Sequence, residues 1–290
     1  MPEASVVIAT HDRSEELRAC LESLELQSAR ARFEIVVVDN GSRDATQSVI
    51  AAAPHVVPVF VAEPNRAKAR NAGIAAASGE LILFCDDDTI APRDFVSAHL
   101  AAHRRTSRAL VSGPIINVQD AASSPAPRSR NYSRAFFCTC NASVAKQELL
   151  AVGGFDEQYD LYGWEDTDLG IRLRERGLRR VFDWSAFIYH VKPPATMAFE
   201  RRRAQAQEKG TMAARFVRKN PSLAVRLATG AYTLNFARAA VLRAPPVRAL
   251  CERLARAGPQ SSLTSALATD ALVDGIYVDA LRAGLRQARA

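Results

Sequence analysis

The sequence predicts an α/β protein with a mainly parallel, Rossmann-like sheet flanked by helices, followed by a helical C-terminal extension. Short β-branched runs alternate with helical segments over residues 4–88, and such alternation is typical of βαβ units and a parallel sheet. Three of the predicted strands end in polar residues, as strands do at the ligand-binding edge of open α/β sheets. Residues 196–290 are basic and show helical spacing, which predicts the extension.

Four apolar runs predict the first four strands. ASVVIAT (4–10) and FEIVVVDNGS (33–42) are short and rich in β-branched residues, which favours buried strands. VVPVFVAEP (56–64) predicts a third, weaker strand. ELILFCDDD (80–88) is the fourth, and its four apolar residues run directly into three aspartates.

Helical segments separate these strands. Segment 14–27 carries Leu17, Leu21 and Leu24 on one helical face and two glutamates in its first turn. Segment 44–53 predicts a second helix, and the alanine-rich segment 66–78 predicts a third that Gly79 closes. The order is therefore strand, helix, strand, helix, as in doubly wound sheets.

Polar residues follow three of the strands. They are Thr10-His11-Asp12, Asp39 to Ser42, and Asp86-Asp87-Asp88. Because the carboxyl ends of parallel strands meet at one edge of the sheet, we expect these residues to lie together and to bind a ligand.

The three consecutive aspartates need a compensating charge. Like charges on adjacent residues repel each other, and the repulsion grows as the surroundings become less polar. Oxygen ligands suit Mg²⁺ or Mn²⁺, and Mg²⁺ is usually held by one or two carboxylates together with substrate phosphates. The run therefore predicts a divalent cation that a diphosphate completes. An exposed acidic turn that binds no metal is the alternative.

A second acidic group begins the helix predicted from WEDTDLGIRLRERG (164–177). Glu165, Asp166 and Asp168 stand near its first turn, where negative charge suits the helix dipole. Trp164 precedes them, and this aromatic neighbour favours a pocket wall, in which a partly desolvated carboxylate can act as a general base.

His190 ends a further strand predicted over residues 180–190. A histidine at the end of a strand often has a structural role. Since a divalent cation is already expected nearby, His190 is also a candidate metal ligand through its imidazole.

Charge and cysteine usage narrow the classes of partner. Residues 198–290 hold 16 Lys and Arg but only 6 Asp and Glu. Solvated helices that pack on the sheet and a basic amphipathic surface that docks on anionic lipid both fit this excess. Aromatic residues are sparse there, so no nucleic-acid partner is expected.

The start of the sequence and the cysteines bear on the location of the protein. The start MPEASVVIATHDR lacks the features of a signal peptide, and the five cysteines fit reduced thiols. We therefore expect a cytoplasmic protein that can contact the inner face of the membrane.

Four motifs in order resemble the GT-A glycosyltransferases of family 2, which are inverting nucleotide-sugar enzymes. SVVIATHDR is similar to the family's opening V-S-V-I-I-P-T-Y-N-R, and IVVVDNGSRDAT to V-V-D-D-G-S-T-D-x-T. ARNAGIAAASGELILFCDDD and NASVAKQELLAVGGFDEQYDLYGWEDTDLGIRL resemble the later donor-side and acceptor-side segments. The resemblance covers residues 4–192. It implies a GT-A catalytic domain over 1–195, with a nucleotide-sugar half to about 115 and an acceptor half from 116, followed by the basic helical region 196–290.

The resemblance also implies which residues bind the donor. Its nucleotide would contact residues at the strand ends and on the third helix, with Asp86 and Asp87 facing the ribose and the metal. The donor-binding residues so implied are Thr10, His11, Arg13, Asp39, Arg70, Asp86 and Asp87. His11 replaces the family's usual Tyr, and Asn40 replaces the second Asp of D-D-G-S, a variant also present in rhamnosyltransferase-like branches. The donor therefore stays open among UDP-, dTDP- and GDP-linked sugars.

The remaining implied roles concern the metal and the acceptor. Asp88 and His190 would hold Mn²⁺ or Mg²⁺ against the β-phosphate, and Asp166 would be the general base. Trp164 and Glu165 would shape the pocket of the acceptor, which is a glycan, a lipid-linked molecule or a small molecule. Two other functions remain open. One is a sugar-1-phosphate nucleotidyltransferase, although such an enzyme would have a glycine-rich phosphate loop after the first strand, and THDRSEEL (10–17) has no glycine. The other is a non-catalytic glycan-binding GT-A homologue.

Overall fold

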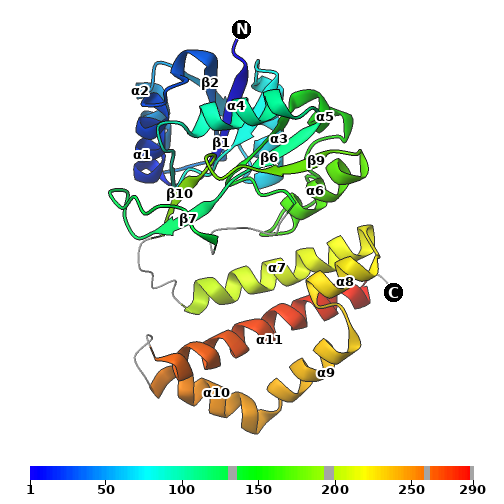
Figure 1. Ribbon diagram of the computed structural model, residues 1–290. Helices are drawn as coiled ribbons and strands as arrows, with labels where there is room; N and C mark the ends of the chain where they lie inside the picture. The colour runs from blue at the N-terminus through cyan, green and yellow to red at the C-terminus, as the bar shows by residue number, and fades with distance from the viewer. Residues whose placement is uncertain (130–135, 193–198, 258–261, 288–290) are drawn as a thin grey trace. The chain divides into compact units, whose positions relative to one another are not determined.

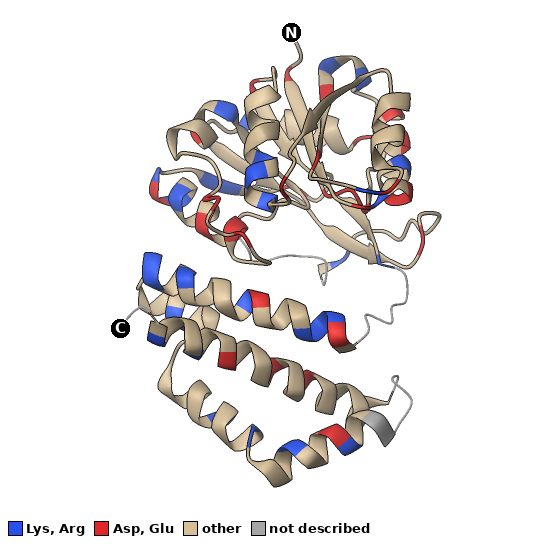
Figure 2. Ribbon diagram, turned by 180° about the vertical axis from the view of Figure 1, so that it is seen from behind, with Lys and Arg blue, Asp and Glu red and all other residues tan. Residues whose placement is uncertain are grey.

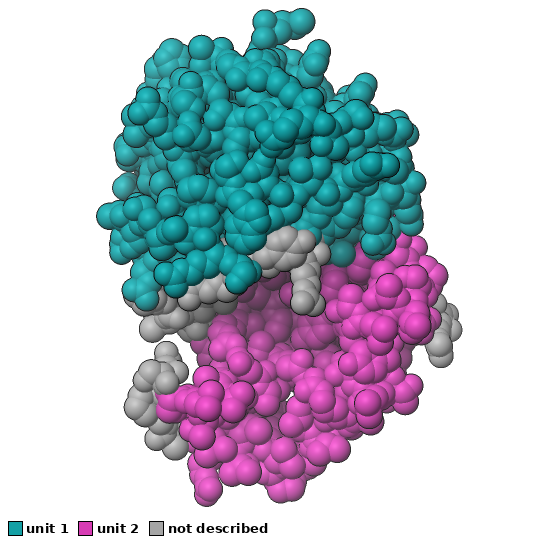
Figure 3. Space-filling view, viewed as in Figure 1, with its two compact units in different colours: residues 1–160, 165–194 teal, residues 161–164, 195–290 magenta. Residues whose placement is uncertain are grey.

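The protein divides into two compact units (Figure 3). The computed structural model describes residues 1–129, 136–192, 199–257 and 262–287. Unit 1 comprises Met1–Asp160 and Glu165–Pro194, and unit 2 comprises Leu161–Trp164 and Ala195–Ala290. The chain therefore leaves unit 1 for four residues directly before Glu165 and then returns to it.

Unit 1 is built on a mainly parallel sheet (Figure 1). Within the described residues this sheet has seven strands in the order β3-β2-β1-β4-β8-β6-β9, and only β8 runs antiparallel to its neighbours. The strands are β1 Ala4–Thr10, β2 Phe33–Asp39, β3 Val56–Phe60, β4 Leu81–Phe84, β6 Ala109–Ser112, β8 Ala142–Ala145 and β9 Arg179–Phe182. The predicted α/β class with a mainly parallel sheet is confirmed.

Alternate residues of the buried strands pack into two hydrophobic layers, one on each face of the sheet. Val6 and Ile8 of β1 pack with the first layer, whereas Val7 between them packs with the second, as the two-residue period of a strand requires. The first layer includes apolar residues of α1 Ser14–Glu25, α2 Thr46–Ala52 and α4 Phe95–Arg105. The second includes those of α3 Arg66–Ala76, α5 Lys146–Ala151 and α6 Glu165–Glu175. A 3₁₀ turn at Arg30–Arg32 leads into β2.

A small second sheet carries His190. Its strands are β5 Thr89–Ile90, β10 Ile188–Val191 and β7 Ile115–Val118, in the order β5-β10-β7. The single strand that we predicted over 180–190 is therefore wrong, because β9 and β10 belong to different sheets. Asp183 and Ser185 form a hydrogen-bonded turn between them, and His190 pairs with Thr89 beside the aspartate run.

Unit 2 is helical, which confirms the predicted helical extension. Its helices are α7 Phe199–Lys219, α8 Leu223–Thr229, α9 Thr233–Leu242, α10 Pro245–Ala257 and α11 Leu263–Gln287. Figure 2 shows basic residues along α7. The helices α7 and α11 cross closely, because Gly210 faces the carbonyl oxygen of Tyr277 and Gly284 faces Ala214. None of the helices in the described ranges has the length and apolarity that a membrane span requires.

A close backbone approach fixes the junction between the two sheets of unit 1. A Cβ atom on Gly113 would lie 1.8 Å from the carbonyl oxygen of Ala186 and 2.8 Å from that of Asp183. Because both neighbours are backbone atoms, no side-chain rotation relieves the overlap. The segment that leads to His190 therefore needs glycine at this position.

We expect Gly113→Ala to lower the free energy of unfolding by about 1–3 kcal/mol, the usual cost of overpacking. Gly275→Ala is the matched control, because a Cβ atom there meets nothing within 4 Å, and alanine stabilises a helix interior by about 0.5–1 kcal/mol relative to glycine. Urea unfolding curves measure both changes. Wild-type stability of the Gly113 variant would contradict the tight junction.

Candidate active site

The ends of β1 and β2 form the first part of the site. Thr10 and Asp39 are paired in register as the last residues of these strands, and each has only 2% of its surface exposed. One oxygen of Asp39, Oδ1, accepts the backbone N–H of Ser42 at 2.9 Å. The other, Oδ2, is buried without a hydrogen-bond partner among the described residues. His11 donates from Nδ1 to the carbonyl oxygen of Asn40 at 2.9 Å.

Arg13 neutralises two of the three consecutive aspartates. Its Nη1 donates to Asp87 Oδ1 at 2.9 Å and to Asp88 Oδ2 at 2.8 Å. Burial raises the pKa of Asp87 to about 6, even though Arg13 opposes this shift. Burial also acts on Asp88, but hydrogen bonds and charge from His190 and Arg13 outweigh it and lower the pKa of Asp88. The two neighbouring carboxyl groups therefore differ in acidity.

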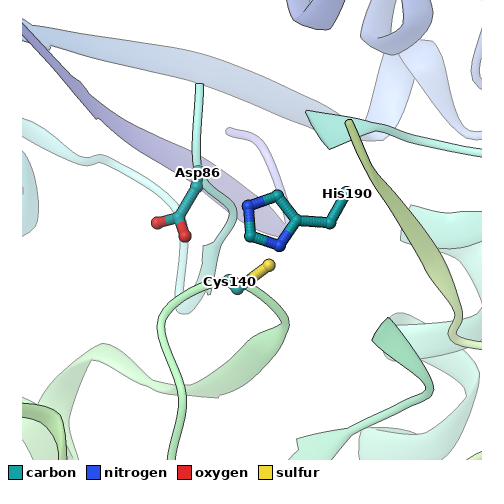
Figure 4. Close-up of side chains that lie close together, drawn as sticks. All are labelled: Asp86, Cys140 and His190. Carbon is teal, nitrogen blue, oxygen red and sulfur yellow. The ribbon is translucent and has the colours of Figure 1, made fainter. Parts of the chain in front are cut away.

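His190 and Cys140 complete this part of the site (Figure 4). The Nε2 atom of His190 lies 3.0 Å from Asp88 Oδ1. One ligand atom each from Asp86, Cys140 and His190 lies within 4.8 Å of the others. Figure 4 shows the carboxylate, the imidazole and the thiol converging from three separate segments. The structure thus brings together Asp88 and His190, the two metal ligands that the family resemblance implies, and adds a thiol beside them.

Arg70 joins the aspartate run to the acids at the start of α6. The guanidinium Nη1 donates to Glu165 Oε1 at 3.1 Å and lies 3.6 Å from Asp166 Oδ1. Its Nη2 atom lies 3.8 Å from Asp86 Oδ1. The side chain of Arg70 is only 12% exposed, and it also lies over the ring of Phe155, 5.5 Å from its centroid. One buried cation thus serves three carboxylates.

The two oxygens of Asp166 have different surroundings. Thr139 donates to Oδ2 from its backbone N–H at 2.9 Å and from its hydroxyl at 3.0 Å. The Oδ1 atom is buried and, within the described part of the chain, has no hydrogen-bond partner. Burial raises the pKa of Asp166 to about 6, opposed by Arg70 and assisted by the charge of Glu165. Thr139 thus holds one oxygen through two hydrogen bonds, whereas the other oxygen faces the guanidinium of Arg70.

Asp168 and Trp164 are arranged differently from Asp166. Asp168 is fully buried and pairs with Arg172 at 2.9 Å, which gives it a structural role in α6. Trp164 belongs to unit 2, where its ring stacks on Phe216 at 5.2 Å and its Nε1 donates to the carbonyl oxygen of Lys209 at 3.1 Å. Its role in binding an acceptor stays a prediction.

Comparison with protein-family models shows the family to which the chain belongs. Residues 5–156 match the family model described as "Glycosyl transferase family 2". The chain belongs to glycosyl transferase family 2. A second model, "N-terminal domain of galactosyltransferase", matches residues 121–201, which include Cys140, Asp166 and His190.

Two curated proteins similar to this chain carry the names of glycosyltransferases. Validoxylamine A glucosyltransferase from Streptomyces hygroscopicus subsp. jinggangensis is 28% identical over 267 residues, covering 77% of this chain and 62% of its own. The uncharacterized glycosyltransferase YfnE of Bacillus subtilis is 26% identical over 239 residues, covering 60% and 61%. The chain therefore spans about 60% of the length of these curated relatives.

Solved structures show that the family 2 chain has the GT-A fold. A mannosyltransferase from Pyrobaculum calidifontis, in complex with GDP-Man and Mn²⁺, superposes with a TM-score of 0.64 at 19% identity, covering 100% of this chain and 88% of its own. Residues 1–349 of S. aureus TarS, in complex with UDP, superpose with a TM-score of 0.59 at 18% identity, covering 100% and 91%.

The sequence motifs of family 2 did not identify Thr139 and Cys140. Both precede β8, which pairs antiparallel with β4 so that Ala142 lies opposite Phe84. Continuing this register by two residues places Cys140 opposite Asp86. The signal in the sequence was the C-T-C-N run that enters the acceptor-side motif, but it gains meaning only once the pairing of the two strands is known.

Proposed function

We propose that this protein transfers a sugar from a nucleoside-diphosphate sugar to an acceptor hydroxyl by a single inverting displacement, assisted by a divalent cation, with Asp166 as the general base. The family membership supports the reaction class. The geometry around Asp166 carries the assignment of the base.

Asp166 has the properties that a general base requires. Efficient proton transfer needs a group whose pKa lies near the working pH, and burial raises the pKa of Asp166 to about 6. Thr139 fixes one carboxylate oxygen, and the other has no hydrogen-bond partner in the described residues. In the proposed reaction, Oδ1 takes the proton of the acceptor hydroxyl while the acceptor oxygen forms the new glycosidic bond. In the same step the bond between the anomeric carbon and the diphosphate oxygen breaks, and the nucleoside diphosphate leaves from the opposite face of the sugar with that electron pair.

The donor is proposed to bind over the ends of β1, β2 and β4. The free Oδ2 atom of Asp39 is a buried acceptor, and a donor group of the base or ribose would satisfy it, because buried polar atoms are normally hydrogen-bonded. Thr10 and His11 would line the same slot. Arg13 lies on Asp87 and Asp88, from where its guanidinium would contact the diphosphate as negative charge develops there.

The residues beside the aspartate run fit a divalent cation. Asp88 and His190 would hold it, since a carboxylate and an imidazole lie 3.0 Å apart there, a carboxylate suits Mn²⁺ and Mg²⁺, and neutral imidazole is a common metal ligand. A cation bound at these residues supplies Lewis-acid stabilisation of the leaving diphosphate. In the structure, Arg13 and the imidazole already surround Asp88, so the chain itself favours the ionised form of this ligand.

Two alternatives come from the sequence. A sugar-1-phosphate nucleotidyltransferase agrees less well with the family match. It would also need a glycine-rich phosphate loop after β1, whereas α1 begins at Ser14 directly after a turn without glycine. A non-catalytic glycan-binding homologue would not need an Asp166 with a raised pKa and one oxygen that accepts no hydrogen bond. Turnover measurements on variants of Asp166 separate this alternative from the enzyme.

We expect Asp166→Asn to lower sugar transfer by about 10² or more, the usual range for a lost general base. Donor affinity should stay nearly unchanged, because the donor is proposed to bind on the side of Asp39 and Asp88. The measurements are steady-state transfer rates and donor titrations by calorimetry.

Glu175→Gln is the matched control for this variant. Glu175 is an exposed acid on the same helix, and its amide variant removes the same charge without touching the site, so we expect unchanged transfer. Near wild-type transfer by Asp166→Asn, or a loss of donor binding in its place, would show that Asp166 is not the base.

Donor binding should also require the cation. Among UDP-, dTDP- and GDP-linked sugars, the one that gives the largest thermal shift with Mn²⁺ would be titrated by calorimetry with Mn²⁺ and with EDTA. We expect affinity to fall at least about tenfold in EDTA, because two anionic phosphates then face carboxylates without a bridging charge. Excess Mn²⁺ should restore binding, and equal affinity under both conditions would refute the requirement.

We also propose that unit 2 contacts an anionic membrane surface, where a lipid-linked acceptor would be found. Its helices expose several leucines, among them Leu223, Leu227 and Leu234, in a region with a basic excess. Apolar side chains among cations are typical of peripheral lipid binding.

Sedimentation with phosphatidylserine vesicles should therefore capture the protein at low salt. Capture should weaken at high salt, because screening reduces the attraction. Phosphatidylcholine vesicles are the control and should bind much less. If the anionic vesicles fail to bind the protein at low salt, the exposed leucines and arginines form an ordinary solvated helical surface.

A further inference from the structure

Cys140 lies within the group of side chains that would hold the divalent cation. The thiol is 4% exposed, and its sulfur lies within 4.8 Å of ligand atoms of both Asp86 and His190. The register of β4 and β8, continued by two residues beyond Phe84 and Ala142, places Cys140 opposite Asp86, and the pairing of β10 with β5 supplies His190. The thiol therefore stands at the site through two separate strand pairings (Figure 4).

A carboxylate, an imidazole and a thiol form a different ligand set from the one proposed for Mn²⁺ or Mg²⁺. Hard cations prefer oxygen ligands, whereas thiolate sulfur favours Zn²⁺ and its heavier, softer relatives. His190 faces both sets, because its Nε2 lies 3.0 Å from Asp88 Oδ1 and it also belongs to the group with Asp86 and Cys140. A cation bound by the sulfur set would therefore share its imidazole ligand with the cation proposed at Asp88.

We propose that Asp86, Cys140 and His190 form a second binding mode for thiophilic divalent cations of the Zn²⁺ and Cd²⁺ class, with the Cys140 sulfur as the ligand that distinguishes it. This mode is also proposed to exclude the catalytic cation, because both cations would bind the imidazole of His190 at adjacent positions. The exclusion rests on the cation site of the proposed function, whereas the sulfur ligand itself does not.

The geometry allows this mode after small side-chain movements. Zinc ligands at 2.0–2.3 Å in a tetrahedral site lie about 3.3–3.8 Å from one another, against separations of up to 4.8 Å in the structure. On binding, the S–H bond of Cys140 is broken, the sulfur keeps the electron pair and forms the metal bond, and the proton passes to solvent. Three protein ligands leave the fourth position to water.

Titration of the full chain with CdCl₂ tests the sulfur ligand directly. Wild-type protein should develop an ultraviolet thiolate-to-cadmium charge-transfer absorption that saturates at one ion per chain. Cys140→Ser should lose this absorption and bind Cd²⁺ at least about 10²-fold more weakly, since even the loss of a residue that only orients a ligand costs 10–100-fold. Circular dichroism checks that the variant is folded, and Cys140→Ala is the second variant if serine is not tolerated.

Cys138→Ser and Cys251→Ser are the matched controls, because both cysteines are free and partly accessible, and both variants should keep the absorption. Mn²⁺ affinity, measured by water-proton relaxation on the same samples, separates the two proposals. A sulfur absorption that depends on Cys140 supports the second mode even if Mn²⁺ does not bind. Absence of the absorption in wild type, or its persistence in both Cys140 variants, overturns it. Cd²⁺ that binds through Cys140 without displacing Mn²⁺ overturns the exclusion.

Discussion

Repulsion between carboxylates is the constraint on which the site of unit 1 depends. The run Asp86 to Asp88 lies close to Glu165 and Asp166, and in buried surroundings such a cluster is stable only where cations offset it. Two arginines do so in this protein: Arg13 pairs with Asp87 and Asp88, and Arg70 lies within 4 Å of Asp86, Glu165 and Asp166. Arg70 matters most, because it is the buried link between the proposed donor side and the proposed acceptor side.

The fold holds Arg70 firmly in this position. It projects from α3, whose start is capped by the side chain of Asn65 accepting the N–H of Lys68. At the next position of the same helix, Asn71 exchanges two hydrogen bonds with the backbone of Phe155, and Phe155 lies under the guanidinium. The loop before α6 is thereby tied to the helix that carries the cation. Chemically similar carboxyl groups then acquire different acidities from their different partners, which is how one site holds both acids and bases.

Much of this arrangement could be predicted from the sequence, because local patterns determine it. The apolar runs of β1, β2 and β4, with the polar residues that follow them, are sufficient to place Thr10, Asp39 and Asp86 at one edge of the sheet. The contributions of Thr139 and Cys140 could not be predicted, since they depend on the antiparallel pairing of β8 with β4 across 58 residues. The division of residues 180–190 between two sheets was missed for the same reason. The role of Arg70 as a shared partner also needed three-dimensional proximity between residues 70, 86 and 165.

Arg70 and burial together set the acidity of Asp166 for its proposed role as base. The pH dependence of kcat/KM at saturating Mn²⁺ tests it most directly, in wild type and in Arg70→Gln. Because only the ionised carboxylate accepts a proton, wild-type kcat/KM should fall tenfold per pH unit below a pKa of about 6. Arg70 opposes the effect of burial, so its removal should move this fall to higher pH by about one unit or more. A fall at the same pH in both proteins, or a wild-type fall confined to pH below the ordinary range of aspartate, would contradict the account.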